Sequence, residues 1–192
     1  MFEIRLHGRG GQGVVTAAEL MSVSAFDEGK HAQAFPSFGS ERMGAPVASF
    51  CRISDSEIRL REPVMEPDAV IIQDPTLLHS VDVFAGLRPS GFLLINSTRR
   101  FTELGISEFT NQFPPNHVRV IDATEIAQRH IGRPVPNAAL LGGFAALTQC
   151  LAIGSVHKAI RERFPGPVGE ANVAAAQEAY DTVLNAEGCL SC

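Results

Sequence analysis

The stretch LHGRGGQGVV, residues 6–15, follows a short run of alternating apolar and charged residues. It contains the pattern Gly-x-Gly-x-x-Gly, formed by Gly8, Gly10 and Gly13, with a further glycine at position 11. Glycines permit a positive φ and let backbone N–H groups approach an anion closely. A helix that starts directly after them directs its positive end to the same point. The stretch therefore predicts the strand, glycine turn and helix that open a Rossmann-like unit.

The rest of the chain continues this alternation of short apolar runs and helical patterns. Strands are expected at residues 2–7, 31–35, 48–53, 58–60, 69–73, 91–96 and 118–121. Helices are expected at residues 14–28, 76–84, 123–127, 137–153, 155–163 and 168–186. Residues 48–53 and 58–60 are expected to pair as an inserted antiparallel hairpin. The pattern favours a Rossmann-like three-layer α/β/α fold with a mainly parallel sheet and a helical C-terminal third.

Length and charge narrow the function classes. The 192 residues suit one domain, which we expect to span residues 1–187, followed by a short tail at residues 188–192. A net charge of -5 argues against a nucleic-acid-binding protein, because such proteins need a basic face. No apolar run approaches the roughly 18 residues of a membrane span, and the N-terminus has no signal pattern. We therefore expect a cytoplasmic protein without a membrane partner.

The cysteines and histidines give no metal-ligand pattern. Cys51 and Cys150 lie in apolar stretches and are expected to be core residues. Cys189 and Cys192 form C-x-x-C in EGCLSC, without the helix of a redox site or two further ligands. Three alternatives stay open for this tail: no bound metal, a metal site completed by a partner, or a reversible disulfide. No catalytic residue or metal ligand is assigned to the chain.

A dinucleotide site would need one further residue. An acidic side chain is expected about 20 positions after the glycines, where it holds the ribose hydroxyls. The corresponding segment, KHAQAFPSF at residues 30–38, contains no Asp or Glu. Glu28 precedes the expected strand and Glu41 follows well after it. The residues therefore argue against binding of NAD.

Four segments together resemble one known family. They are GRGGQGV at residues 8–14, AFPSFGSERMGAPV at 34–47, REPVMEPDAVIIQDPTLL at 61–78 and NAALLGGFAAL at 137–147. These segments resemble the gamma subunit, or gamma domain, of 2-oxoacid:acceptor oxidoreductases. That family includes enzymes for pyruvate, 2-oxoglutarate, 2-oxoisovalerate, indolepyruvate and phenylglyoxylate. The resemblance spans about residues 1–165, and EGCLSC lies outside it.

The resemblance implies a larger enzyme, in which alpha, beta and delta subunits are the partners of this chain. Such enzymes decarboxylate a 2-oxo acid oxidatively with thiamine diphosphate and Mg²⁺, pass electrons through [4Fe–4S] clusters and typically form an acyl-CoA. The electron acceptor is ferredoxin, flavodoxin or NAD. This chain has no Gly-Asp-Gly motif for thiamine diphosphate and no four-cysteine run for a cluster. It is therefore expected to be a non-catalytic part of an oxidoreductase complex.

The resemblance also suggests site residues. The glycine turn, made of Gly8, Arg9, Gly10, Gly11, Gln12 and Gly13, is expected to meet an anion such as a phosphate of coenzyme A (CoA). The alternative is that its glycines only permit tight packing and a subunit contact. In the second motif, Ser37, Ser40, Glu41 and Arg42 are candidates for an interface or active-site rim, or belong to a simple surface loop.

Asn137 is a candidate helix cap or ligand contact. Two rival functions remain open. One is a stand-alone NAD- or FAD-binding oxidoreductase, and the other is an assembly module that binds no ligand.

Overall fold

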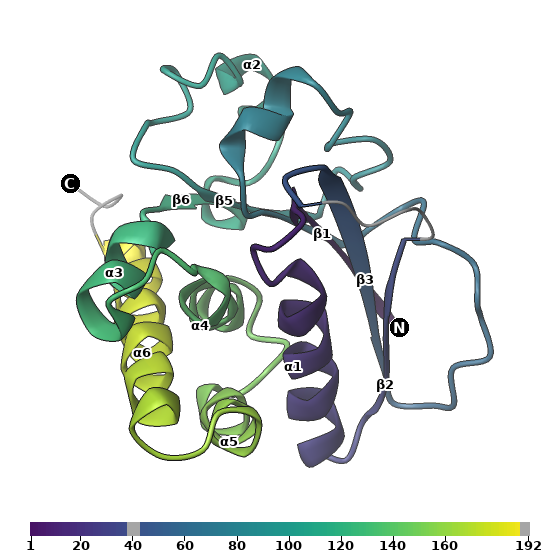
Figure 1. The fold of residues 1–192 in the computed structure, drawn as a ribbon. Coiled ribbons are helices and arrows are strands. Elements are labelled where there is room, and N and C mark those ends of the chain that lie inside the picture. The colour runs from purple at the N-terminus through teal and green to yellow at the C-terminus, as the bar shows by residue number, and fades with distance from the viewer. Residues whose placement is uncertain (38–42, 189–192) are drawn as a thin grey trace.

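The structure, a computed structural model, describes residues 1–37 and 43–188. Its centre is a mixed sheet in the order β2-β3-β1-β4-β5-β6 (Figure 1). The strands are β1 (Phe2–Arg9), β2 (His31–Pro36), β3 (Pro46–Ser54), β4 (Ala69–Ile72), β5 (Phe92–Asn96) and β6 (Val118–Ile121). β1, β4, β5 and β6 are parallel, whereas β3 is antiparallel to both β1 and β2. The mainly parallel sheet with an antiparallel insertion is thus confirmed.

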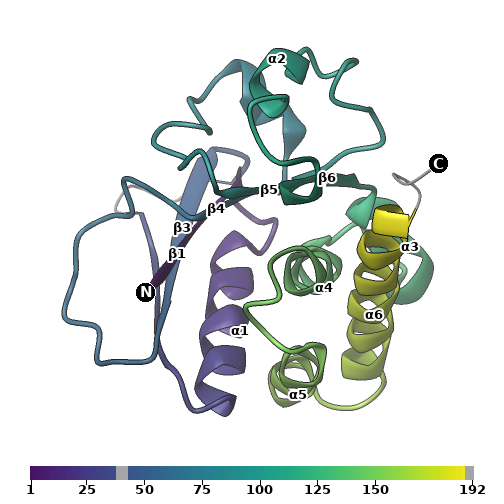
Figure 2. The same cartoon turned by 180° about the vertical axis from the view of Figure 1, so that it is seen from behind.

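The long helices cover one face of this sheet. They are α1 (Val14–Asp27), α3 (Ala123–Ile131), α4 (Asn137–Thr148), α5 (Ile153–Arg163) and α6 (Pro167–Gly188). The other face carries η1 (Pro75–His79), α2 (Ser107–Thr110), η2 (Pro115–His117) and irregular segments. Figure 2 shows the resulting layers from behind, with the helical C-terminal third on one side. The three-layer fold is confirmed, although its second outer layer is thin.

The central parallel strands are apolar on both sides because both faces are covered. In β4 and β5, successive side chains point to opposite faces. Ile71 and Leu94 join the core beneath the long helices, whereas Val70 and Ile95 join a second core beneath η1 and α2. Each of these four side chains is buried.

The direction of the crossovers creates a crevice. α1 follows β1 and packs on the helical face, whereas the segment after β4 packs its Leu77 and Val83 on the opposite face. Such a change of side leaves a crevice beyond the carboxyl ends of the strands at which it occurs. Here those strands are β1 and β4, and the glycine turn follows β1.

Two expected elements are wrong. Residues 58–60 form no strand, because both edges of β3 are already occupied by β1 and β2. The antiparallel hairpin is formed by β2 and β3 instead. The helix expected at residues 76–84 is only η1, which is capped by the side chain of Asp74.

The helix that starts at Asn137 is shorter than expected. It ends at Thr148 because Gln149 adopts a left-handed conformation, with φ of 53°. α4 runs between the sheet and α6, and a Cβ at Gly142 would lie 1.9 Å from the carbonyl oxygen of Ala176. The glycine therefore allows the two helix backbones to touch.

Within the described ranges, no helix is both long and apolar enough to cross a membrane.

Candidate anion-binding site

The glycine turn joins the end of β1 to the start of α1. Gly11 and Gly13 have φ of 91° and 79°, values that favour glycine. Gly13 is the N-cap of α1, and its carbonyl oxygen accepts the first helical hydrogen bond from Ala17 N at 2.9 Å. The N–H groups of residues 14–16 precede that bond and carry the positive end of the helix. The turn therefore has the geometry of an anion site.

Close packing also requires these glycines. A Cβ at Gly8 would lie 2.5 Å from Val14 Cγ2, and a Cβ at Gly13 would lie 2.9 Å from Asn137 Nδ2. At Gly11 it would lie 2.8 Å from Met43 Cε. Both roles considered for the glycines, backbone approach to a ligand and tight packing, are therefore compatible with one structure.

Arg9 ties three segments together at this point. Its Nε lies 3.2 Å from Asp74 Oδ2, and its Nη2 donates to Thr76 Oγ1 at 2.8 Å. Its Nη1 donates to the carbonyl oxygen of Gly44 at 3.0 Å. The positive charge expected in the turn is present, but the carboxylate of Asp74 is its direct partner.

Gln12 connects the turn to the same carboxylate. Its Nε2 donates to Asp74 Oδ2 at 2.9 Å, and its Oε1 accepts from the backbone N–H of Arg9 at 2.8 Å. Burial favours a higher pKa for Asp74, but hydrogen bonds from Thr76 and Gln12 and the charge of Arg9 hold that pKa below its ordinary value. Asp74 is therefore an ionised support of the turn.

The second motif returns to the glycine turn. The N–H of Gly10 donates to Ala45 O at 2.9 Å, and Gly44 N donates to Gly10 O at 3.0 Å. Met43 is 87% exposed at this junction. Two of the four segments that carry the family resemblance thus meet through backbone hydrogen bonds.

The candidate residues of the second motif are placed only in part. Ser37 follows the edge strand β2, and its N–H donates to Ala48 O at 2.8 Å. Because β3 lies between β2 and β1, Ser37 is about 10 Å from the β1 backbone. Ser40, Glu41 and Arg42 lie outside the described residues.

Asn137 is brought to the turn, although it does not cap its helix. The N-cap position is occupied by Pro136, so the expected cap is wrong. Asn137 is buried, its Oδ1 accepts from Ala138 N at 2.9 Å, and its Nδ2 faces Gly13. The alternative role as a ligand contact remains a prediction.

His7 lies in the strand beneath the turn. Arg5 Nε donates to His7 Nε2 at 3.0 Å. Burial, and then the charge of Arg5, lower the pKa of His7 to about 4. His7 is therefore a neutral acceptor within the protein at physiological pH.

Two hollows lie at this edge of the sheet. The first has a volume of about 310 Å³ and is lined by Arg9, Gly10, Gly11, Gly13, Val14, Val15 and Val47. The second, of about 400 Å³, is lined mainly by polar residues, among them Asn96, Asp122 and Thr124. Pro75, which lines the second hollow, directly follows Asp74, which contacts the glycine turn at the first hollow.

Sequence patterns alone did not identify Asp74, Thr76 and Asn96 as residues of the candidate site. Their positions could have identified them, because each ends or follows a buried parallel strand. Ligand-binding polar groups commonly lie at the carboxyl ends of such strands.

In residues 1–37 and 43–188, no three His, Cys, Asp or Glu side chains gather in a group that could hold a metal ion. Cys51 is buried, and burial raises the pKa of Cys150 to about 11. Both are thus poor thiolate donors. Cys189 and Cys192 lie outside the described residues.

Comparison with known proteins gives a consistent result. The family model of pyruvate ferredoxin/flavodoxin oxidoreductase matches residues 3–182. The chain is 47% identical over 181 residues to pyruvate synthase subunit PorC of Methanothermobacter marburgensis, covering 94% of this chain and 97% of that protein. It is 46% identical over 184 residues to the pyruvate/ketoisovalerate oxidoreductases common subunit gamma of Thermococcus kodakarensis, covering 96% and 98%. The crystal structure of pyruvate oxidoreductase subunit PORC from Thermotoga maritima superposes with a TM-score of 0.79 at 36% identity, covering 94% of this chain and 95% of that one.

Proposed function

The chain belongs to the pyruvate ferredoxin/flavodoxin oxidoreductase family, as a gamma subunit of a multisubunit 2-oxoacid oxidoreductase, and on this premise we propose that its glycine turn binds a phosphate of CoA. The observation that carries the proposal is the left-handed Gly13, which aims the N–H groups of residues 14–16 at an adjacent hollow. The chain supplies this binding surface and a subunit contact, and it performs no chemistry alone.

The residues around the turn fit an elongated anionic ligand. The backbone N–H groups of Val14 and Val15 would hold the phosphate, and Asn137 Nδ2 would lie behind Gly13. The side chains of Val15 and Val47 give the same hollow an apolar wall for the uncharged part of the ligand. Arg9 positions the turn and adds only a partly neutralised charge, because Asp74 pairs with it.

The fold argues against the rival dinucleotide site. Such a site takes its acidic residue from the second parallel strand, beside the first. Here the neighbour of β1 on that side is β3, which is antiparallel and so presents its amino end. β2, with the sequence HAQAFP, contains no acidic residue. A CoA phosphate therefore accounts for the turn better than NAD or FAD does.

The remaining assignments complete the proposal. We assign residues 1–187 to one gamma-type domain and residues 188–192 to a C-terminal segment, whose first residue, Gly188, still belongs to α6. Ser37, Ser40, Glu41 and Arg42 belong to a rim that faces the alpha, beta and delta partners in the cytoplasm. Those partners hold thiamine diphosphate, Mg²⁺ and [4Fe–4S] clusters, which supply the decarboxylation and the electron path.

The test compares two variants of equal size in the assembled enzyme. Val15 lines the hollow and is partly exposed. Val15→Glu places a negative charge beside the phosphate, whereas Val15→Gln does not. We expect the dissociation constant for CoA, measured by calorimetry without the 2-oxo acid, to rise at least about tenfold more for Glu than for Gln.

A carboxylate in the first turn stabilises a helix, so misfolding would not explain the loss. Equal affinities in the two variants would refute the proposal. Impaired assembly with unchanged CoA binding would favour the rival function, in which this chain is an assembly module that binds no ligand.

A further inference from the structure

β6 is the edge strand of the sheet on the side opposite β2. Ser97 N donates to Ile121 O at 3.0 Å, so the polar backbone groups of Ile121 point toward β5. Because these groups alternate along a strand, those of Arg119 also point to β5, and those of Val118 and Val120 point outward. In agreement, Arg119 Nη1 reaches around the edge and donates to Val118 O at 2.9 Å.

The other backbone groups of β6 that point outward have no hydrogen-bond partner among the described residues. Within the described part of the chain, the N–H groups of Val118 and Val120 and the carbonyl oxygen of Val120 make no hydrogen bond. Unpaired groups of this kind can template the addition of another strand. Val118 O already accepts a hydrogen bond from Arg119 Nη1, so the open edge is short.

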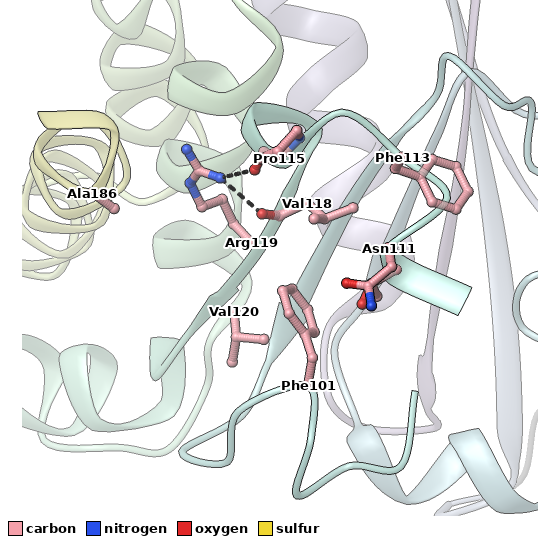
Figure 3. A pocket seen from close by; sticks show the side chains of 9 residues that line it. Phe101, Asn111, Phe113, Pro115, Val118, Arg119, Val120 and Ala186 are labelled. Atoms are coloured by element: carbon pink, nitrogen blue, oxygen red, sulfur yellow. Dashed lines mark hydrogen bonds between the residues drawn. The ribbon is translucent and has the colours of Figure 1, made fainter. Parts of the chain in front are cut away.

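An apolar hollow of about 580 Å³, here named the β6 groove, lies beside these groups. Val118 and Val120 contribute side chains from the strand, Phe101 and Phe113 come from the segment between β5 and β6, and Ala186 comes from α6. Figure 3 shows these side chains around the groove, with Arg119 bonded to Pro115 and Val118 at its rim. The groove can thus receive an apolar side chain next to an open strand edge.

We propose that an extended segment of another subunit of the enzyme adds to the sheet along β6 and inserts an apolar side chain into the β6 groove. An extended chain can satisfy the outward N–H groups and, two residues apart, place side chains on the groove face. A helix would cover the groove but leave the edge groups unpaired.

Charge further specifies this segment. Arg99 and Arg100 are exposed and directly precede Phe101, which lines the groove. Their guanidinium groups favour a carboxylate on the incoming segment and disfavour a lysine or arginine. The chain is one subunit of a multisubunit enzyme, so other subunits are available to supply such a segment.

The first experiment measures amide hydrogen exchange in the isolated chain and in the assembled enzyme. Strand addition is expected to slow the exchange of Val118 and Val120 N–H at least tenfold on assembly. Unchanged exchange at both residues would overturn the proposal. This readout does not depend on CoA, so it can fail while the proposed anion site stands, and the reverse also holds.

Variants test the groove and its charge. Val120→Asp is expected to weaken assembly at least tenfold, whereas Val23→Asp, on an exposed residue of α1, is the matched control and leaves assembly unchanged. Arg100→Glu is also expected to weaken assembly several-fold. Because this substitution changes only an exposed side chain, it tests the proposal even if Val120→Asp fails to fold. Normal assembly of both groove-side variants would refute the proposal.

Two other occupants give different results. If residues 189–192 of the same chain occupied the edge, truncation after residue 188 would speed exchange at Val118 and Val120 in the isolated chain. If a second copy did so, their protection in the isolated chain would rise with protein concentration. Either outcome overturns the proposal of a partner segment.

Discussion

Asp74 contacts the glycine turn near both of its ends, because its Oδ2 forms an ion pair with Arg9 Nε at 3.2 Å and accepts a hydrogen bond from Gln12 Nε2 at 2.9 Å. The turn is thus held by a residue that follows β4, a strand that pairs with β1. The charge of Arg9 is balanced inside the protein, and the helix N–H groups are left as the main attraction for an anion.

Asp74→Asn keeps the shape of this support but removes its charge. We expect the variant to bind CoA a few-fold more tightly, because a negative charge near the phosphate is gone, and to lose about 1 kcal/mol of stability. Calorimetry and urea unfolding measure these two effects. Weaker CoA binding would show that the position of Arg9 matters more than the local charge.

The same variant should alter acid sensitivity. The folded pKa of Asp74 is lowered, so its ionised form stabilises the native state above its unfolded pKa of about 3.9, and that stability is lost as the pH falls through the folded pKa. Asp74→Asn should therefore show a shallower loss of stability below about pH 4. An identical acid transition would contradict an ionised Asp74.

His7 predicts a second pH effect at higher pH. Its folded pKa of about 4 lies below the ordinary value of 6.5, so the unfolded chain binds more protons between these values. The contribution of His7 is fully present above about pH 6.5 and declines by up to about 1.4 kcal/mol per pH unit below it. His7→Gln keeps an acceptor for Arg5, and its unfolding free energy should vary less over this window. Equal slopes for the variant and the parent would exclude this role.

Gly13 and Gly154 form a matched pair. Gly13→Ala forces an alanine into a positive φ against Asn137, and the expected cost is about 1–3 kcal/mol. Gly154 lies in α5 with open space around its Cβ position, so Gly154→Ala should be neutral or stabilise by up to about 1 kcal/mol. Thermal unfolding of both variants measures the difference. Equal melting temperatures would show that the turn rearranges freely.

Gly142 and Gly143 should differ although they are adjacent. An alanine Cβ at Gly142 meets backbone, the carbonyl of Ala176, at 1.9 Å, whereas at Gly143 it meets the end of the Ile121 side chain at 2.8 Å. Backbone yields less readily than a side-chain methyl, so Gly142→Ala should cost about 3 kcal/mol and Gly143→Ala about 1 kcal/mol. Denaturant unfolding ranks the two, and the reverse order would contradict the α4–α6 contact.

The order of elements could be predicted from local patterns, whereas their partners could not. The apolar runs at residues 69–73 and 91–96 predicted β4 and β5, and the glycine turn predicted the start of α1. The position of β3 between β1 and β2 depends on contacts between distant segments, so the expected pairing with residues 58–60 was wrong.

The candidate site shows the same division. The glycines were identified by their spacing, but Asp74 reaches the turn only because β4 pairs with β1, and periodicity carries no such information. Residues 34–47 were expected to form a loop at an interface, at an active-site rim or simply at the surface. Their described contact, at Gly44 and Ala45, is instead a pair of backbone hydrogen bonds to Gly10.

This pairing of Gly10 with Gly44 and Ala45 has an evolutionary consequence. Backbone groups make the contacts, so substitutions on either side can accumulate while the junction persists. A single inserted or deleted residue within positions 43–46 would shift the donors and acceptors out of step and release the carbonyl that Arg9 binds. Descendants of this chain are therefore expected to inherit the spacing of these positions more faithfully than their side chains.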